Sequence, residues 1–176
     1  MRTMKRILAV LTAVLLTGTL AFSQSLEGRW TGTVYETTGE GDDVLSMTAV
    51  YTYTLTGGDY TLFLDTTVDM GMTDVPPFQV LVTVTGTWTR EGDVLTFIPA
   101  KKPKPQTELR ADGMPGILRA VIANPIKKDL VKELQDPESY EILILTDTAL
   151  SMKEIPSAKD LKDPDFTATV LSMERK

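Results

Sequence analysis

Strict alternation between apolar and hydroxyl-bearing residues is the feature that most constrains this chain. In residues 78–90 one face collects threonines and the other collects Val80, Val82, Val84, Gly86 and Trp88. Residues 44–56 alternate in the same way, with one face formed by Met47, Ala49, Tyr51, Tyr53 and Leu55. A period of two is the spacing of a strand that is buried on one face and exposed on the other. The sequence therefore predicts a mostly β fold built from half-buried strands.

The same signals mark eight strands along the chain. We expect them at residues 29–38, 44–56, 59–69, 78–90, 93–99, 139–146, 148–154 and 165–174. Tight turn sequences at residues 56–59, 90–93 and 146–148 make the strands that they join antiparallel neighbours. An eight-stranded antiparallel meander favours closure into a barrel, because closure removes the exposed sheet edges.

Residues 100–136 interrupt this meander with a Pro- and Lys-rich linker and a helical insert. Two apolar stripes at helical spacing occur in residues 116–135, formed by Ile117, Leu118, Val121 and Ile122 and then by Ile126, Leu130 and Leu134. Asn124 suits a helix N-cap and Pro125 suits the first helical position, so we expect Pro125 to begin a second helix. The prediction is a helical hairpin inserted between the fifth and sixth strands.

Residues 1–23 have the pattern of a secretory signal peptide. A basic start, an apolar run and a cleavage site with small residues follow one another at Arg2, Lys5 and Arg6, at residues 7–16 and at residues 21–23. We therefore expect an exported protein, periplasmic or secreted, that is cleaved near Ser23 and leaves one domain over residues 24–176. The chain has no cysteine, which excludes a lipid-carrying cysteine and disulfides.

Histidine is absent as well as cysteine. Their absence excludes Ser-His-Asp triads, Cys-His pairs and the usual zinc sites. A hydrolase that uses carboxylates alone is the enzymatic alternative, but nothing in the sequence fixes two acids at the separation that glycosidases require. We therefore expect a non-catalytic protein without a cofactor.

The charge is strongly uneven along the chain. The whole chain has a net charge of −6, and removal of residues 1–23 makes it −9. Residues 101–132 nevertheless carry +5, so a basic insert sits in an acidic protein. The acidic balance argues against nonspecific nucleic-acid binding.

Two Gly-x-Trp triplets, Gly28-Arg29-Trp30 and Gly86-Thr87-Trp88, carry a family resemblance. Together with the signal peptide and the eight-strand meander, they resemble the lipocalin-like (calycin) β-barrels, particularly small exported bacterial ones. The resemblance implies that both triplets lie at the closed end of the barrel. It also implies a basic side chain from a late strand stacked over the first-strand Trp, and Arg175 is the residue available for Trp30. The chain departs from the family pattern in the position of its helical insert.

Several side chains are candidates for a ligand site. Tyr51, Tyr53, Val82 and Val84 share inward-facing positions and are candidates to line a cavity, although a small barrel can equally be filled by its own side chains. Trp30 and Trp88 fit barrel core better than a pocket wall. On the helical insert, Lys127, Lys128 and Lys132 are candidates to receive an anionic head group or to contact an anionic membrane surface transiently. The alternative is that they form a solvated helix face.

The remaining candidates are acidic and methionine groupings. Glu40 with Asp42 and Asp43, and the series Asp65, Asp69 and Asp74, lack the spacing of a calcium loop. Two thioethers at Met70 and Met72 are too few to define a copper site. Solvated turns explain these groupings, so no metal is expected.

The function expected from the sequence is binding of a small hydrophobic or amphipathic ligand, with an anionic lipid-like molecule as one option. The alternative is a barrel with a filled core that acts on another protein in the cell envelope, for example as an inhibitor. The sequence leaves the oligomeric state open.

Overall fold

The protein is described here by a computed structural model that covers residues 25–38, 44–158, 160–162 and 167–176. In these residues nine strands form one antiparallel sheet, in the order β3-β2-β1-β9-β8-β7-β5-β4-β6. Their bounds are β1 Gly28–Thr38, β2 Leu45–Thr56, β3 Asp59–Asp69, β4 Phe78–Glu91, β5 Val94–Pro99, β6 Gln106–Arg110, β7 Glu138–Leu145, β8 Ala149–Ile155 and β9 Val170–Arg175. The proposed signal peptide lies outside the described residues.

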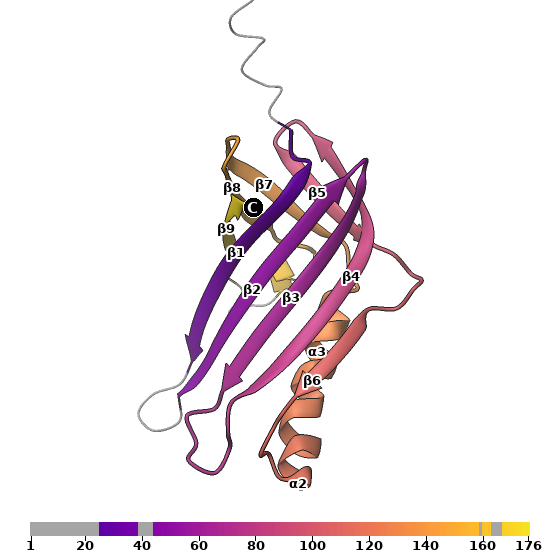
Figure 1. The fold of residues 1–176 in the computed structure, drawn as a ribbon. Helices are drawn as coiled ribbons and strands as arrows, with labels where there is room; N and C mark the ends of the chain where they lie inside the picture. The colour runs from indigo at the N-terminus through magenta and orange to yellow at the C-terminus, as the bar shows by residue number, and fades with distance from the viewer. Residues whose placement is uncertain (1–24, 39–43, 159, 163–166) are drawn as a thin grey trace, which may run out of the picture.

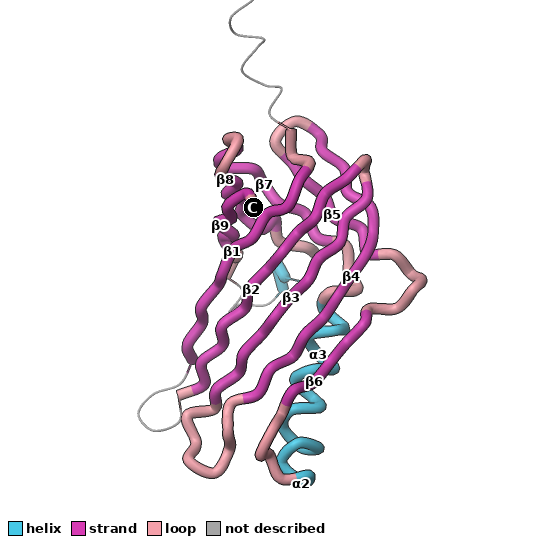
Figure 2. The backbone as a smooth tube through the Cα atoms, viewed as in Figure 1, coloured by secondary structure: helices cyan, strands magenta, loops and turns pink. Residues whose placement is uncertain are grey.

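The sheet closes into an eight-stranded antiparallel barrel. An additional pairing joins β3 to β4, so that every strand except β6 belongs to a continuous ring. Figures 1 and 2 show the long strands β1 to β4 side by side as the front wall, with β7, β8 and β9 behind one end of it. The predicted mostly β barrel is therefore confirmed, and the predicted strands occur with small differences at their ends. The last strand is the exception, because within the described residues it begins only at Val170.

Strand β4 is long enough to hold two partners on the same edge. Its residues 86–91 pair with β5, and its residues 79–83 pair with β6. The linker between β5 and β6 projects away from the barrel wall as a loop (Figure 1). The sequence predicted a linker and helical insert over residues 100–136, and strand β6 within this segment corrects that prediction. Gln106–Arg110 is short and polar, and only its pairing with β4 makes it a strand.

The helical insert is one continuous helix and not the predicted hairpin. It consists of α2 (Gly116–Leu118), a π-helical turn η2 (Arg119–Ala123) and α3 (Asn124–Glu133). Asn124 has helical dihedral angles and makes no side-chain cap. Proline lacks an N–H group, and its ring crowds the carbonyl four residues earlier in an α-helix. The wider π turn immediately before Pro125 relieves that conflict, so the chain continues in the same direction.

The helix packs against the barrel core beside β6, the strand that lies outside the closed ring. Strand β9 pairs with β1 over a short stretch, residues 30–32 of β1. Strand β6 is the last in the strand order. The helix lies alongside β6 (Figure 1) and its inward residues pack against the barrel core, namely Leu118, Ile122, Ala123, Ile126, Leu130 and Leu134. Ile117 and Val121, which were predicted to share the first stripe, are instead 78% and 63% exposed.

Among the described residues, no helix has the length and apolar character needed to span a bilayer.

Candidate ligand-binding site

Aromatic side chains fill the end of the barrel interior that lies between β2, β3, β5 and β7. The ring centroids of Tyr53 and Phe97 are 4.7 Å apart in a stacked arrangement. Tyr60 and Tyr140 meet Phe97 edge-on, with centroid distances of 5.1 and 6.1 Å. Such offset and edge-to-face contacts are the geometries that aromatic pairs prefer. The rings therefore form a single packed cluster.

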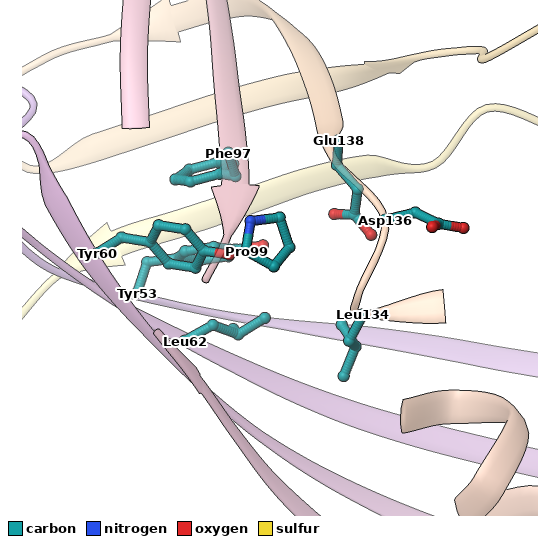
Figure 3. A pocket seen from close by; sticks show the side chains of 8 residues that line it. All are labelled: Tyr53, Tyr60, Leu62, Phe97, Pro99, Leu134, Asp136 and Glu138. Carbon is teal, nitrogen blue, oxygen red and sulfur yellow. The ribbon is translucent and has the colours of Figure 1, made fainter. Parts of the chain in front are cut away.

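The space left inside this cluster is small. A cavity of about 10 Å³ is bordered by the residues shown in Figure 3, namely Tyr53, Tyr60, Leu62, Phe97, Pro99, Leu134, Asp136 and Glu138. That volume has room for about one water molecule. The described interior at this point is thus filled by side chains, which is one of the two outcomes that the sequence left open.

The predicted lining residues lie on the inner wall, but only one of them borders the cavity. Val82 and Val84 on β4 have exposed fractions of 0% and 2% and face Leu64 and Leu62 of β3. Tyr51 is partly buried at the level of Leu64, whereas Tyr53 reaches the cavity. The structure therefore makes Val82 and Val84 part of the packed core.

Glu138 places a carboxylate at the edge of this aromatic cluster. The Tyr140 hydroxyl donates a hydrogen bond of 2.7 Å to Glu138 Oε2. Desolvation by burial is the main reason that the pKa of Glu138 is raised, and the charges of Glu154, Glu133 and Asp136 raise it further, while the bond from Tyr140 lowers it. Glu138 is thus a partly buried acid in a negative environment.

The tyrosines around Glu138 respond to the same environment. Burial is the largest cause in each case, and it raises the pKa of Tyr51 and Tyr60 to about 12. The pKa values of Tyr53 and Tyr140 are raised well above the ordinary value of 10.0. The negative charge of Glu138 adds to the shift of all four hydroxyls, so all four lie within its electrostatic reach.

A groove of about 550 Å³ lies directly outside the cavity, between the end of α3 and strands β7 and β8. It is lined by Glu133, Asp136, Pro137, Glu138, Ser139, Glu154, Ile155, Pro156, Ser157 and Asp160. Asp136 and Glu138 border both the groove and the inner cavity, so the two spaces adjoin. Five of the described lining residues are acidic and none is basic. The Glu138 carboxylate, which borders both spaces, can hold the positively charged end of a ligand.

The three lysines predicted to receive an anionic head group lie on α3. Lys128 and Lys132 are exposed, and Lys127 is partly buried. None of the three is among the described residues that line the cavity or the groove. Lys128 and Lys132 follow the exposed Ile117 and Val121 on the side of the helix opposite its packed residues. The structure does not bring these lysines together with Tyr51, Tyr53, Val82 and Val84.

The residues that the resemblance implies at the closed end of the barrel lie beside the aromatic cluster, because Trp30 is paired with Tyr53 and Trp88 with Phe97. Trp30 is fully buried, and its indole N–H donates a 2.7 Å hydrogen bond to the Leu26 carbonyl. The Arg175 guanidinium lies over its ring, while the backbone of Gly28 has a φ of 127° and passes beside Arg175. Trp88 is partly buried against the same core.

Gly86 lies where β4 passes close to the neighbouring strands. A Cβ atom there would lie 2.6 Å from Tyr60 Cε1 and would also collide with the Ile98 carbonyl oxygen. The absence of a side chain at Gly86 therefore lets β4 pass against β3 and β5.

In the described part of the chain, no three His, Cys, Asp or Glu side chains converge as they would around a metal ion. Glu40, Asp42 and Asp43 lie outside the described residues. The Asp69 carboxylate instead accepts a hydrogen bond from the Gly71 amide within its own turn.

Sequence reasoning missed Glu138, Tyr140, Tyr60 and Phe97 as parts of one site. Tyr60, Phe97 and Tyr140 each stand at inward positions of predicted strands, which is a signal for core but not for a site. Glu138 immediately precedes the predicted strand at residues 139–146, where an acid ordinarily indicates a solvated turn.

No known protein family and no curated protein matches this chain.

Proposed function

We propose that this chain is an exported, non-catalytic barrel that binds a small amphipathic ligand in the groove at the end of α3. The observation that carries the proposal is the contrast between a cavity of about 10 Å³ inside and a groove of about 550 Å³ immediately outside. The volume of the groove falls within the range typical of small-molecule sites. A lipid-sized molecule cannot enter the packed aromatic cluster, so the ligand lies mainly in the groove.

The lining of the groove suits a molecule with an apolar body and one polar end. Pro137, Ile155 and Pro156 supply apolar contacts, and Ile155 is 38% exposed. The polar end would lie against the carboxylates next to the inner cavity. Membership of the lipocalin-like (calycin) barrels of the small exported bacterial type is part of the same proposal, and the Trp30–Arg175 contact supports it.

Native mass spectrometry tests the proposal. Residues 24–176 would be expressed with export intact, purified gently and measured before and after extraction with organic solvent. We expect a discrete adduct that disappears on extraction and returns when the extract is added back. An apo mass that persists when extract and lipids are offered would contradict ligand binding.

Matched variants locate the adduct. Ile155→Ser removes an apolar contact from the groove, whereas Val170→Ser removes a comparably exposed residue that does not line the groove. We expect only Ile155→Ser to weaken binding. Replacing Lys127, Lys128 and Lys132 together by Gln should leave binding unchanged, and a loss of binding would favour the anionic head-group hypothesis.

A filled-core barrel that acts through its surface is the second candidate function. The packed interior and the exposed pair Ile117 and Val121 favour it, because exposed apolar side chains next to basic ones suit contact with a partner or with an anionic membrane surface. It predicts an apo mass together with a stoichiometric envelope partner, whose binding Ile117→Ser with Val121→Ser abolishes.

A further inference from the structure

We propose that Glu138 and the aromatic cavity beside it recognise a primary ammonium group at the polar end of the ligand. This inference rests on the proposed function, because it assigns the ligand class of the same groove. The expected charge of the ligand is therefore positive, whereas the basic helical insert suggested a negatively charged ligand.

The position of Glu138 is the first argument. Its side chain borders the outer groove and the inner cavity, so a ligand that lies in the groove can extend one end to it. Figure 3 shows Glu138 on the side of the cavity that lies across from Tyr53 and Tyr60, while Asp136 points away from the rings. An incoming charged group would therefore meet the Glu138 carboxylate on one side and aromatic rings on the other.

The charge of Glu138 itself is the second argument. Glu138 takes part in no ion pair with another of the described residues. A partly buried carboxylate that lacks a cation is unfavourable, and a ligand cation placed beside it removes that penalty. Burial raises the pKa of Glu138, and the charges of the neighbouring acids raise it further. Aromatic rings attract the same cation through their negative faces.

The size of the cavity selects the kind of cation. Room for about one water molecule also admits an unsubstituted ammonium group, whereas a trimethylammonium group is several times larger. The Tyr140 hydroxyl already donates to Glu138 Oε2, and an ammonium group has three N–H donors for the remaining acceptor positions of that carboxylate. A divalent metal is disfavoured because no three potential ligands converge in the described residues.

A fluorescent amine provides the direct test. Dansylcadaverine carries a primary ammonium group on a five-carbon chain, and its N-acetyl derivative has the same body without the charge. We expect the full mature chain to bind the amine at least about tenfold more tightly than the acetylated probe, because only the amine pairs with the carboxylate.

Two variants on the same strand separate the site from general electrostatics. Glu138→Gln keeps the size of the side chain and removes its charge, and we expect it to weaken amine binding about tenfold or more. Glu141→Gln removes the same charge from an exposed position of β7, and we expect a change of less than about twofold. Circular dichroism would verify that both variants are folded.

The pH dependence of amine affinity distinguishes direct recognition by Glu138 from a purely structural role, which would not produce it. Amine affinity should fall as the pH is lowered and Glu138 takes up a proton, and this fall should be absent in Glu138→Gln. The groups that share its environment belong to β2, β3, α3, β7, β8 and the α3–β7 connection, and they are Tyr51, Tyr53, Tyr60, Glu133, Asp136, Tyr140 and Glu154. Equal binding of both probes, or full amine binding by Glu138→Gln, would overturn the inference.

The outcome also separates this inference from the proposed function. If neither probe binds but native mass spectrometry shows an adduct that Ile155→Ser removes, the ligand class is wrong and the groove remains the site. If neither probe binds and no adduct is found, both proposals fail.

Discussion

The guanidinium carbon of Arg175 lies 4.6 Å from the centroid of the Trp30 ring, and the two residues face each other across the β1–β9 ladder. Arg175 also donates a hydrogen bond to the Ser25 carbonyl, which ties the last strand to the segment that enters the first. One side chain thus covers the indole at the barrel end and joins the two ends of the described chain.

Replacing Arg175 by Gln should therefore destabilise the barrel. The change removes a cation–π contact and a charge-assisted hydrogen bond, and we expect a loss of about 1–2 kcal/mol in the free energy of unfolding. Urea unfolding followed by tryptophan fluorescence measures it. Lys176→Gln removes a neighbouring exposed charge and is the control, and an equal loss in both variants would contradict a specific Trp30 contact.

Gly86→Ala should be far more damaging than its size suggests. The added methyl group would meet the Ile98 carbonyl oxygen and lie 2.9 Å from Pro99 Cα, so backbone and not only side chains would have to move. Overpacking of this kind costs about 1–3 kcal/mol or more. Gly116→Ala is the matched control, because a Cβ there meets nothing within 4 Å. Thermal unfolding of the two variants would decide the point, and similar melting temperatures would contradict the close approach.

The stability of the protein should depend on the protonation of Glu138. Its pKa in the folded state is raised above the ordinary value of 4.5, mainly by burial, so the folded state favours the protonated acid. The stabilisation that this provides is fully present below pH 4.5 and is lost as the pH rises through the raised pKa. Glu138→Gln should consequently gain stability over the wild type at neutral pH but not at acid pH. Urea unfolding across this range measures the difference, and a constant difference would contradict the shift.

Alkaline pH should destabilise the barrel through its inner tyrosines. The pKa of Tyr60 is about 12 in the folded state, against an ordinary value of 10.0, because burial disfavours the phenolate. The associated stability is present below pH 10 and is lost as the pH rises toward 12. Tyr60→Phe should reduce this loss, whereas Tyr35→Phe changes a tyrosine that is 67% exposed and serves as the control. Tyrosinate absorbance and unfolding midpoints measured together would test it, and identical alkaline profiles would count against it.

The strands could be predicted because their signals are local. Each alternating run contains the information for its own two faces, and short turns fix which neighbours pair. The same reasoning failed at residues 106–110, because a short polar segment becomes β6 only when the edge of β4 is available to it. It failed again at Pro125, where the Asn124-Pro125 pair indicated the start of a second helix. The π turn before Pro125 instead lets the first helix continue through it.

The candidate site could not be predicted in the same way. Tyr53, Phe97 and Tyr140 belong to three strands that are distant in sequence, and only barrel closure brings their rings together. The sequence shows Glu138 as one acid among many, since burial and neighbouring charge are properties of its surroundings.

The sequence by itself determined the strand pattern, the antiparallel connections and the absence of histidine and cysteine chemistry. The contact of a late basic residue with Trp30 was an expectation of the family resemblance. The tertiary structure alone decided that side chains fill the interior at the aromatic cluster, that the helical insert is continuous, and that Glu138 lies between this cluster and an acidic groove. The physical reason is that periodicity is a property of neighbouring residues, whereas cavity volume, burial and electrostatic fields depend on which distant segments come to lie beside one another.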